Sequence, residues 1–270
     1  MTRKNIQLNI ITIFPDLISG LLQWGVVGQA VKHNILSVKV VNPRDFTDDP
    51  HRSVDDRPYG GGDGMVFIAE PLKRAVESLG AAAGRRIFLS AHGPKWSDQM
   101  ARSRAADILS SGESLTFICG RYGGVDQRFL NEYVDEEISI GDYILSGGEL
   151  AAAVVIDSLA RFLPGVLGNE ESKDSDSFSQ GLLEAPLFTR PQEFAGQAVP
   201  APLISGDHKK IASFRQALAL AITRERRPEL LTLEQNQKDW PTAKKYLRQI
   251  SDVELKACGL GTEILQEIYQ

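Results

Sequence analysis

The sequence is poor in cysteine and has no long apolar run. Its two cysteines, Cys119 and Cys258, lie far apart in no partnering pattern. This excludes a disulfide scaffold and a zinc module and favours a reducing, cytoplasmic location. The longest apolar stretches, such as 151–156, are far shorter than the roughly 20 residues of a membrane span, so we expect no membrane partner. The first residues lack a small-residue cleavage site and lead into a predicted strand, so we expect no signal peptide.

Charge of neither sign dominates the chain. The 30 Lys+Arg and 35 Asp+Glu give a net charge of −5, and with 42% hydrophobic residues the composition is that of a globular protein. The charges are unevenly spread, because residues 190–250 contain 11 basic and 6 acidic residues. Such a segment is most often a solvated helical face, but it also suits a surface that binds nucleic acid.

Strand-like and helix-like segments alternate through the first 165 residues. The predicted strands are residues 6–14, 35–41, 87–90, 115–119 and 134–140, and the predicted helices are residues 15–22, 71–79, 98–109, 125–133 and 149–163. Alternation of this kind predicts an α/β fold with a largely parallel sheet that is covered by helices on both faces.

The composition changes after residue 167. The segment 168–180 is polar and acidic, and the proline-rich stretch after it is predicted to be irregular. Asp207 is a suitable N-cap for a helix that runs to residue 226, a second helix is predicted at 233–250, and a third short helix near the end. We therefore expect three parts: a domain at 1–167, a linker or substrate loop at 168–182, and a small, mostly helical domain at 183–270.

Three glycine-rich turns are the most distinctive local feature. They are YGGGDGM at 59–65, GRYGG at 120–124 and SGGE at 146–149. None has the GK[S/T] ending of a phosphate-binding loop or the GxGxxG spacing of a dinucleotide fold. Singly, each is more often a tight turn than a ligand loop. Together, at strand ends, they favour a ligand that is held by backbone amides and carbonyls.

Candidate metal ligands are few. The acidic run at 135–137 has the right chemistry, but such a run is more often a solvated strand edge. The four histidines form no pair with metal-ligand spacing. The sequence therefore assigns no metal-binding residue.

A series of segments resembles one known family. In chain order they are NPRDF (42–46), VDDRPYGGG (54–62), CGRY (119–122), SIGDYILSGGEL (139–150), RFLPGVLG (161–168), DSF (176–178) and RRPELL (226–231). They resemble bacterial tRNA (guanine-N1)-methyltransferases of the SPOUT superfamily, and the resemblance covers nearly the whole chain.

The resemblance implies a function and an assembly. The expected activity is transfer of a methyl group from S-adenosylmethionine to N1 of the guanosine at tRNA position 37, next to the anticodon. The expected fold is a SPOUT-type parallel sheet with a C-terminal trefoil knot, in a homodimer whose active site is shared between subunits. Mg²⁺ is also implied, without identifiable ligands. Periodicity predicts neither the knot nor the dimer, and general topology rules disfavour knots.

The resemblance also implies site residues. Arg161 corresponds to the catalytic arginine and Asp176 to the general base. Leu89 and Ser90 would begin the loop that contacts adenosine. The remaining implied cofactor residues are Gly120, Tyr122, Ile140, Gly141, Asp142, Tyr143, Ile144, Leu145, Gly147 and Gly148.

The chemistry of the reaction supports the two catalytic assignments. Methylation at N1 requires removal of its proton and stabilisation of the negative charge that develops on O6. An aspartate, with an ordinary pKa of about 3.9, is too weak a base to ionise guanine alone. A guanidinium at O6 would share the work. Without the resemblance, Asp176 would be read as a loop residue and Arg161 as a cation at a helix end.

The basic residues Arg224, Arg226, Arg227, Lys244 and Lys245 are predicted to contact tRNA phosphates. Several positions depart from the family pattern: Gly123 stands where glutamate is usual, Ala91 and His92 replace proline and glutamine, Ala151 replaces proline, and Asp63 interrupts a glycine turn. Two alternatives therefore stay open. One is a methyltransferase with another RNA target, and the other is a tRNA-binding paralogue that no longer catalyses.

Overall fold

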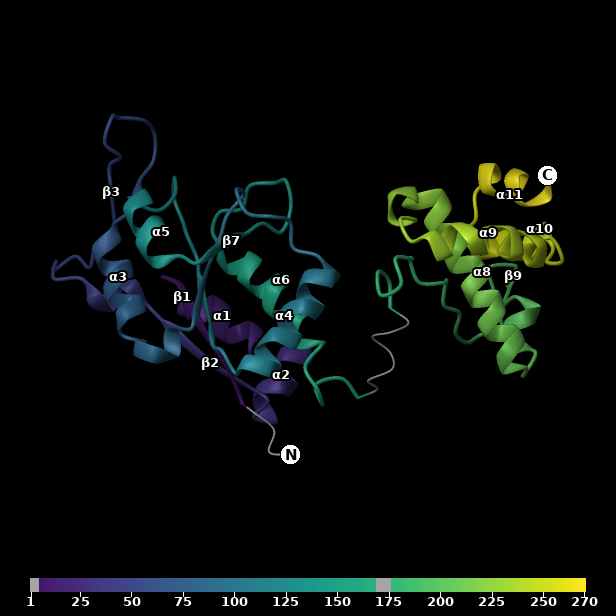
Figure 1. Ribbon diagram of the computed structural model, residues 1–270, viewed down its shortest axis with the longest axis horizontal. Helices are drawn as coiled ribbons and strands as arrows, with labels where there is room; N and C mark the ends of the chain where they lie inside the picture. The colour runs from purple at the N-terminus through teal and green to yellow at the C-terminus, as the bar shows by residue number, and fades with distance from the viewer. Residues whose placement is uncertain (1–4, 169–175) are drawn as a thin grey trace. The chain divides into compact units, whose positions relative to one another are not determined.

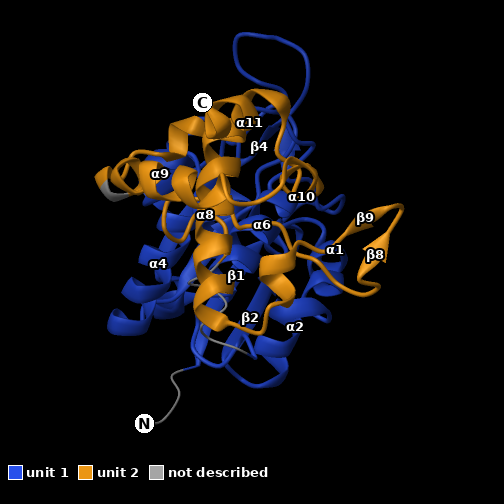
Figure 2. Ribbon diagram, turned by 90° about the vertical axis from the view of Figure 1, so that its right-hand side faces the viewer, with its two compact units in different colours: residues 1–170 blue, residues 171–270 orange. Residues whose placement is uncertain are grey.

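The computed structural model describes residues 5–168 and 176–270. The chain divides into two compact units, Met1–Glu170 and Glu171–Gln270, which Figure 2 draws in blue and orange. Each unit has its own buried apolar core. We describe each unit by itself.

The first unit is built on a parallel sheet of five strands in the order β2-β1-β6-β5-β7. The strands are β1 (Ile6–Ile11), β2 (Leu36–Val41), β5 (Arg85–Leu89), β6 (Leu115–Ile118) and β7 (Glu136–Ile138). Every neighbouring pair in this sheet is parallel, with Leu8 of β1, for example, opposite Val38 on one side and Leu115 on the other. The predicted parallel α/β sheet is therefore confirmed.

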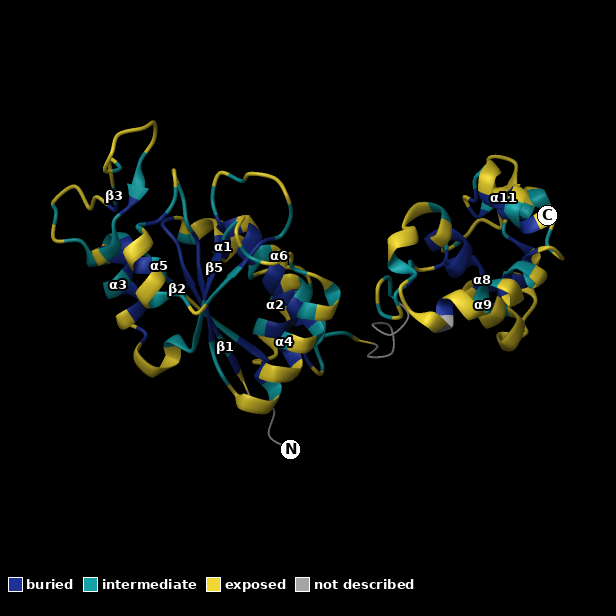
Figure 3. Ribbon diagram, turned by 45° about the horizontal axis from the view of Figure 1, so that its top comes forward, coloured by how far each residue is buried: buried dark blue, intermediate teal, exposed yellow. Residues whose placement is uncertain are grey.

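Helices cover both faces of the sheet (Figure 1). On one face lie α1 (Pro15–Leu21), α2 (Gly25–Lys32), α4 (Asp98–Ser111) and α6 (Glu149–Ala160), and on the other lie α3 (Ala69–Glu77) and α5 (Gln127–Tyr133). Alternate strand residues point to opposite faces, so Leu115 and Phe117 enter the core under α6 whereas Ile118 enters the core under α3. Figure 3 shows the resulting buried layer along the strands.

Short elements complete the first unit. They are the 3₁₀ turns η1 (Pro43–Phe46) and η2 (Gly80–Ala83) and the antiparallel pair β3 (Asp55–Asp56) and β4 (Val66–Phe67). None of the described helices is long and apolar enough to cross a membrane.

The structure differs from the sequence prediction at two places near the amino terminus. The first strand ends at Ile11 and not at residue 14, because the Thr12 side chain turns back to accept a hydrogen bond from the Phe14 amide. Helix α2 was not predicted. Its eight residues include Gly25 and Gly28, which weaken helix propensity, and it is stabilised by Val27 and Ala30 in the core.

The second unit is mainly helical. Its elements are the hairpin β8 (Glu193–Phe194) and β9 (Gln197–Ala198), the turns η3 (Ala201–Ile204) and η4 (Pro228–Leu230), and the helices α8 (His208–Arg226), α9 (Glu234–Leu247), α10 (Asp252–Ala257) and α11 (Thr262–Tyr269). The predicted N-cap is confirmed, since the Asp207 carboxylate accepts hydrogen bonds from the amides of Lys209 and Lys210. The hairpin lies in the stretch that was predicted to be irregular, and two helices, not one, close the chain.

The described part of the predicted linker, residues 176–182, belongs to the second unit. The next residue, Leu183, donates its amide to the Thr223 hydroxyl at 2.8 Å, and the Asn236 side chain donates to the Gln180 carbonyl at 3.0 Å. Leu182 is buried in the core of this unit. Residues 176–182 are thus fixed to α8 and α9, whereas 169–175 lie outside the described residues.

Candidate active site

A cleft of about 420 Å³ opens at the carboxyl ends of β5, β6 and β7. Its walls come from the segments 88–92, 120–125 and 138–148, each of which ends or follows one of these strands. We call it the glycine cleft. In open parallel sheets, ligands bind outside the carboxyl ends of the strands, so this is the position where a ligand is expected.

The structure brings nearly all the predicted cofactor residues to this cleft. Leu89, Ser90, Gly120, Tyr122, Ile140, Gly141, Tyr143, Ile144, Leu145, Gly147 and Gly148 line it. Asp142 does not: its carboxylate forms an ion pair with Lys95, and its side chain is 77% exposed.

The second and third glycine turns, residues 120–124 and 146–149, form one wall of the cleft from closely packed backbone. The Gly148 amide donates to the Gly120 carbonyl at 2.9 Å, which ties the two turns together. A Cβ atom on Gly148 would lie 2.8 Å from the Cα of Cys119, and one on Gly120 would lie 2.8 Å from the Phe88 ring. At Gly148 the obstacle is backbone, so glycine is required there for lack of space, whereas at Gly120 the Phe88 ring would have to move.

A buried ion pair that the sequence analysis missed lies beside this wall. Glu149, at the first position of α6, is 1% exposed. Its carboxylate receives the Thr12 hydroxyl at 2.7 Å and the Arg121 guanidinium at 3.1 Å. The Arg121 guanidinium also stacks over the Phe14 ring, 4.2 Å from its centre. Burial and, to a smaller extent, the Glu149 charge raise the pKa of the nearby Cys119 thiol well above its ordinary value.

Four of the five positions that depart from the family pattern, Ala91, His92, Gly123 and Ala151, line the cleft, and Asp63 does not. Gly123 lines the cleft, and its amide donates to the Met65 carbonyl at 2.7 Å. His92 also lines it, with an 88% exposed side chain whose Nδ1 lies 3.9 Å from the Glu137 carboxylate. Tyr122 has a positive φ of 62°, and partial burial is the main cause that raises the pKa of its hydroxyl.

The two predicted catalytic residues belong to different units. Arg161 is the C-cap of α6 in the first unit, where a cation is favoured by the helix dipole. Asp176 belongs to the second unit, where its carbonyl accepts the Ser179 hydroxyl at 2.8 Å.

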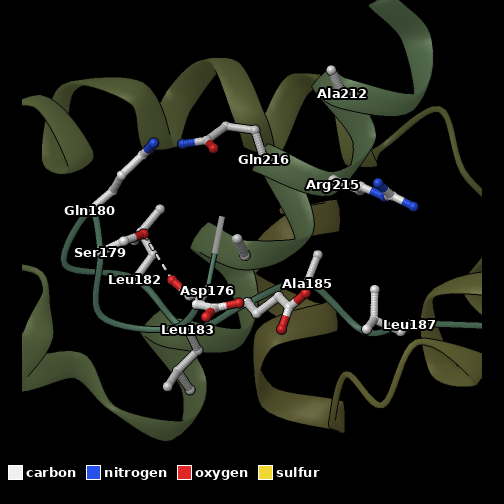
Figure 4. A pocket seen from close by; sticks show the side chains of 12 residues that line it. Asp176, Ser179, Gln180, Leu182, Leu183, Ala185, Leu187, Ala212, Arg215 and Gln216 are labelled. Carbon is white, nitrogen blue, oxygen red and sulfur yellow. Dashed lines mark hydrogen bonds between the residues drawn. The ribbon is translucent and has the colours of Figure 1, made fainter. Parts of the chain in front are cut away.

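Asp176 lines a second cavity, of about 360 Å³, that we call the Asp176 cavity (Figure 4). Apolar side chains form part of its wall, and polar or charged side chains form the remainder. The apolar members are Leu182, Leu183, Ala185, Leu187, Ala212 and Ala219, and the polar members beside Asp176 are Ser179, Gln180, Glu184, Arg215 and Gln216. Such a mixed wall suits a flat, amphipathic group such as a nucleobase.

The predicted RNA-binding arginines are engaged within the second unit. Both carboxylate oxygens of Glu267 receive the Arg224 Nε, at 2.9 and 3.0 Å, and this lowers the pKa of the Glu267 carboxyl. Arg227 pairs with Glu229, and Arg226 donates to the Gly259 carbonyl at 2.7 Å.

The two lysines of that set lie in the last turn of α9. The charge of Lys244 makes a minor contribution to the lowered pKa of Glu267, after that of Arg224. Lys245 is exposed and forms no ion pair with any residue of 5–168 or 176–270. Over the same residues, no group of three or more His, Cys, Asp or Glu side chains is placed to hold a metal ion.

Comparison with known proteins gives one consistent result. Residues 6–233 match the family model described as tRNA (Guanine-1)-methyltransferase TrmD. Three curated relatives named tRNA (guanine-N(1)-)-methyltransferase each align with 83% of this chain. The relative from Actinobacillus succinogenes is 48% identical with 91% of its length covered, that from Shewanella frigidimarina 50% with 89%, and that from Blochmanniella pennsylvanica 48% with 88%.

Proposed function

The chain belongs to the tRNA (guanine-1)-methyltransferase family, and from this premise we propose that it methylates N1 of the guanosine at position 37 of tRNA, with S-adenosylmethionine as the methyl donor. The observation that carries the proposal is the glycine cleft, where the residues that match the family's cofactor motif line one cavity at the carboxyl ends of three parallel strands.

The shape and chemistry of the cleft suit this donor. Its glycine wall leaves little room for side chains at Gly120 and Gly148, so a flat ring can approach the backbone closely. Backbone amides and carbonyls of 120–122 and 140–148 would hydrogen-bond the adenosine, and the one arginine or lysine among the described residues that line the cleft, Arg121, is paired with Glu149. When bound, S-adenosylmethionine supplies an electrophilic methyl group on a sulfonium.

Two side chains would perform the acid–base part of the reaction. Asp176 accepts the N1 proton of guanine, and the Arg161 guanidinium donates hydrogen bonds to O6 as negative charge develops there. The two roles depend on each other, because a carboxylate can take that proton only if the resulting anion is stabilised. The apolar part of the Asp176 cavity supports the assignment, since it offers the base a surface beside the carboxylate.

We further propose a homodimer whose active site is shared between subunits. Helix α6 supports this, because it is apolar on several sides and leaves Leu150 and Val154, one turn apart, about half exposed. The apolar side chains Phe14 and Leu17 of the neighbouring α1 region are exposed as well. A second copy of the chain would cover these residues, and Val154→Lys should therefore yield monomers in light scattering and lose activity.

A trefoil knot belongs to the same proposal. It is supported by the close approach of the segment after β7 to the segment after β5, where the Ser139 amide donates to the Pro94 carbonyl at 3.0 Å and the Trp96 amide donates to the Ser139 carbonyl at 2.7 Å. A magnesium requirement is also proposed from the family, with no ligand set assigned.

The deciding experiment is methylation of tRNA transcripts that carry guanosine or adenosine at position 37, together with calorimetric titration of S-adenosylmethionine. We expect micromolar cofactor binding and methylation of the guanosine transcript alone. Equal methylation of both transcripts would identify another RNA target. Cofactor binding without methylation would favour a tRNA-binding paralogue, the alternative that Gly123 suggests. No binding at millimolar cofactor would contradict the proposal.

A further inference from the structure

The buried ion pair of Arg121 and Glu149 connects three separate parts of the sheet edge. Thr12 follows β1, Arg121 follows β6, and Glu149 begins α6. The Glu149 carboxylate accepts hydrogen bonds from both of the other side chains, at 2.7 Å from Thr12 and 3.1 Å from Arg121. Glu149 is thus the single acceptor at which these three elements meet.

The same pair supports the glycine wall. Arg121 and Gly147 form a backbone bridge, and a Cβ atom on Gly147 would collide with the Arg121 guanidinium and the Glu149 carboxylate. The next residue, Gly148, donates its amide to Gly120. The charged groups therefore lie directly against the backbone that walls the cleft, and Arg121 itself lines the cleft.

A carboxylate is an expensive group to bury, and apolar residues of similar volume would often be at least as stabilising. Stability alone therefore gives a weak reason for an ion pair at this position. Its placement gives a better one, because the pair fixes the second and third glycine turns, which together form one wall of the cleft, at one separation.

We propose that Glu149 is a positioning residue for cofactor binding: it holds Arg121, and through Arg121 it sets the spacing of the Gly120 and Gly147–Gly148 backbones that receive the cofactor. This inference rests on the proposed function for the identity of the ligand. The arrangement of the turns itself is independent of that identity.

The first test is Glu149→Gln, which leaves one acceptor oxygen but turns an amide group toward the guanidinium. We expect the dissociation constant for S-adenosylmethionine to rise at least tenfold. We also expect the Gly148 amide to exchange with solvent at least tenfold faster in the ligand-free protein, because its bond to Gly120 loosens. Exchange at the wild-type rate would overturn the inference whether or not the cofactor is correctly identified.

The second test separates positioning from stability. The double variant Arg121→Met with Glu149→Leu removes both charges, so no buried charge is left unpaired and thermal stability should return to near the wild-type value. Cofactor affinity should stay at least tenfold weaker, because nothing then holds the two turns at their spacing. Recovery of both stability and affinity would show that the pair is merely structural.

The matched control is Asp135→Asn, which breaks the ion pair with Arg86 at the amino ends of β5 and β7, the opposite end of the sheet from the cleft. This variant should lower thermal stability and leave cofactor affinity within twofold of wild type. A tenfold loss of affinity in this control would overturn the inference, since any lost ion pair would then suffice. A wild-type chain that binds no cofactor would contradict the proposed function, and the exchange measurement would still decide the role of Glu149.

Discussion

The glycine cleft of the first unit and the Asp176 cavity of the second unit are walled by different parts of the chain. In the cleft, the tightly packed backbone of the second and third glycine turns forms one wall, and positions such as Gly148 have no room for a side chain. In the Asp176 cavity, side chains of α8 and of the segment that begins at Asp176 form the wall. The cleft is therefore defined by its shape, and the cavity by its functional groups.

This difference predicts how each site responds to substitution. A backbone wall changes only when its spacing changes, so small additions of volume should damage binding in the cleft. A side-chain wall keeps its shape when one polar group is exchanged for an isostere, so such an exchange in the cavity should remove chemistry and leave binding intact. Three experiments test this contrast, and a fourth tests the predicted tRNA contacts of the second unit.

The largest effect is expected for Asp176→Asn. The amide is nearly isosteric with the carboxylate but cannot accept the N1 proton, so kcat should fall by about 10²- to 10⁴-fold, the usual contribution of a general base. Calorimetry should give a dissociation constant for S-adenosylmethionine within twofold of wild type, because Asp176 does not line the cleft. A variant with undiminished kcat would refute the assignment of Asp176 as base.

The next effect is expected for Gly148→Ala. The φ of Gly148 is −76°, which alanine adopts readily, so only space matters, and the new Cβ would lie 2.8 Å from the backbone of Cys119. Overpacking costs about 1–3 kcal/mol. If the wall relieves this strain by moving into the cleft, the same free energy corresponds to about a 5- to 150-fold loss of cofactor affinity.

Its control is Gly20→Ala in α1, where an added Cβ meets no atom within 4 Å. Both variants place alanine in helical backbone, so they differ only in what the methyl group touches. If calorimetry finds that the two variants bind S-adenosylmethionine equally well, close backbone packing does not define the cleft.

The sequence predicts the features of the two units that depend on local interactions, and it misses those that depend on residues far apart in the chain. The strand at 115–118 and the N-cap at Asp207 could be predicted because their signals, an apolar run and a capping side chain, are local. Helix α2 was missed because its stability comes from the core and not from its glycine-containing sequence.

The long-range partners could not be predicted. In the sequence, Glu149 is an acidic residue at a helix start, where solvent exposure is usual, yet Thr12 is 137 positions away and the pair with Arg121 spans 28. Likewise, Arg224 belongs to a basic run in the sequence, but its partner Glu267 lies 43 positions later. The charge of a segment does not reveal which of its cations are already neutralised.

The third-largest effect concerns tRNA affinity, which should depend on those cations that no carboxylate neutralises. Lys245→Gln should weaken tRNA binding a few-fold and reduce the slope of log affinity against log salt by about one phosphate contact, because Lys245 is exposed and has no ion pair among the described residues. Arg224→Gln should change the slope less, since its charge is held by Glu267. Filter binding at several salt concentrations measures both. A larger slope change for Arg224→Gln would reverse this ranking.

The smallest effect is expected for Gly123→Glu, which restores the carboxylate that the family usually has at the rim of the cleft. The backbone of Gly123 needs no positive φ, but the new Cβ would lie 3.1 Å from the Met65 carbonyl, which already accepts the Gly123 amide. The loop must therefore yield by a few tenths of an ångström. An exposed carboxylate attracts the cofactor's ammonium by roughly 1 kcal/mol or less, so calorimetry should give an affinity for S-adenosylmethionine that is unchanged or up to about fivefold tighter.

Gly123→Gln is the matched control for this last substitution, because it adds the same volume without the charge. If Glu binds the cofactor more tightly than Gln, the rim contributes by electrostatics, as a side-chain wall does. If both variants lose cofactor affinity alike by more than tenfold, the close contact with the Met65 carbonyl determines the affinity. The rim of the cleft then responds to added volume as the glycine turns do. Comparison of the two variants therefore locates the boundary, within one cleft, between the part built from backbone and the part that side chains can tune.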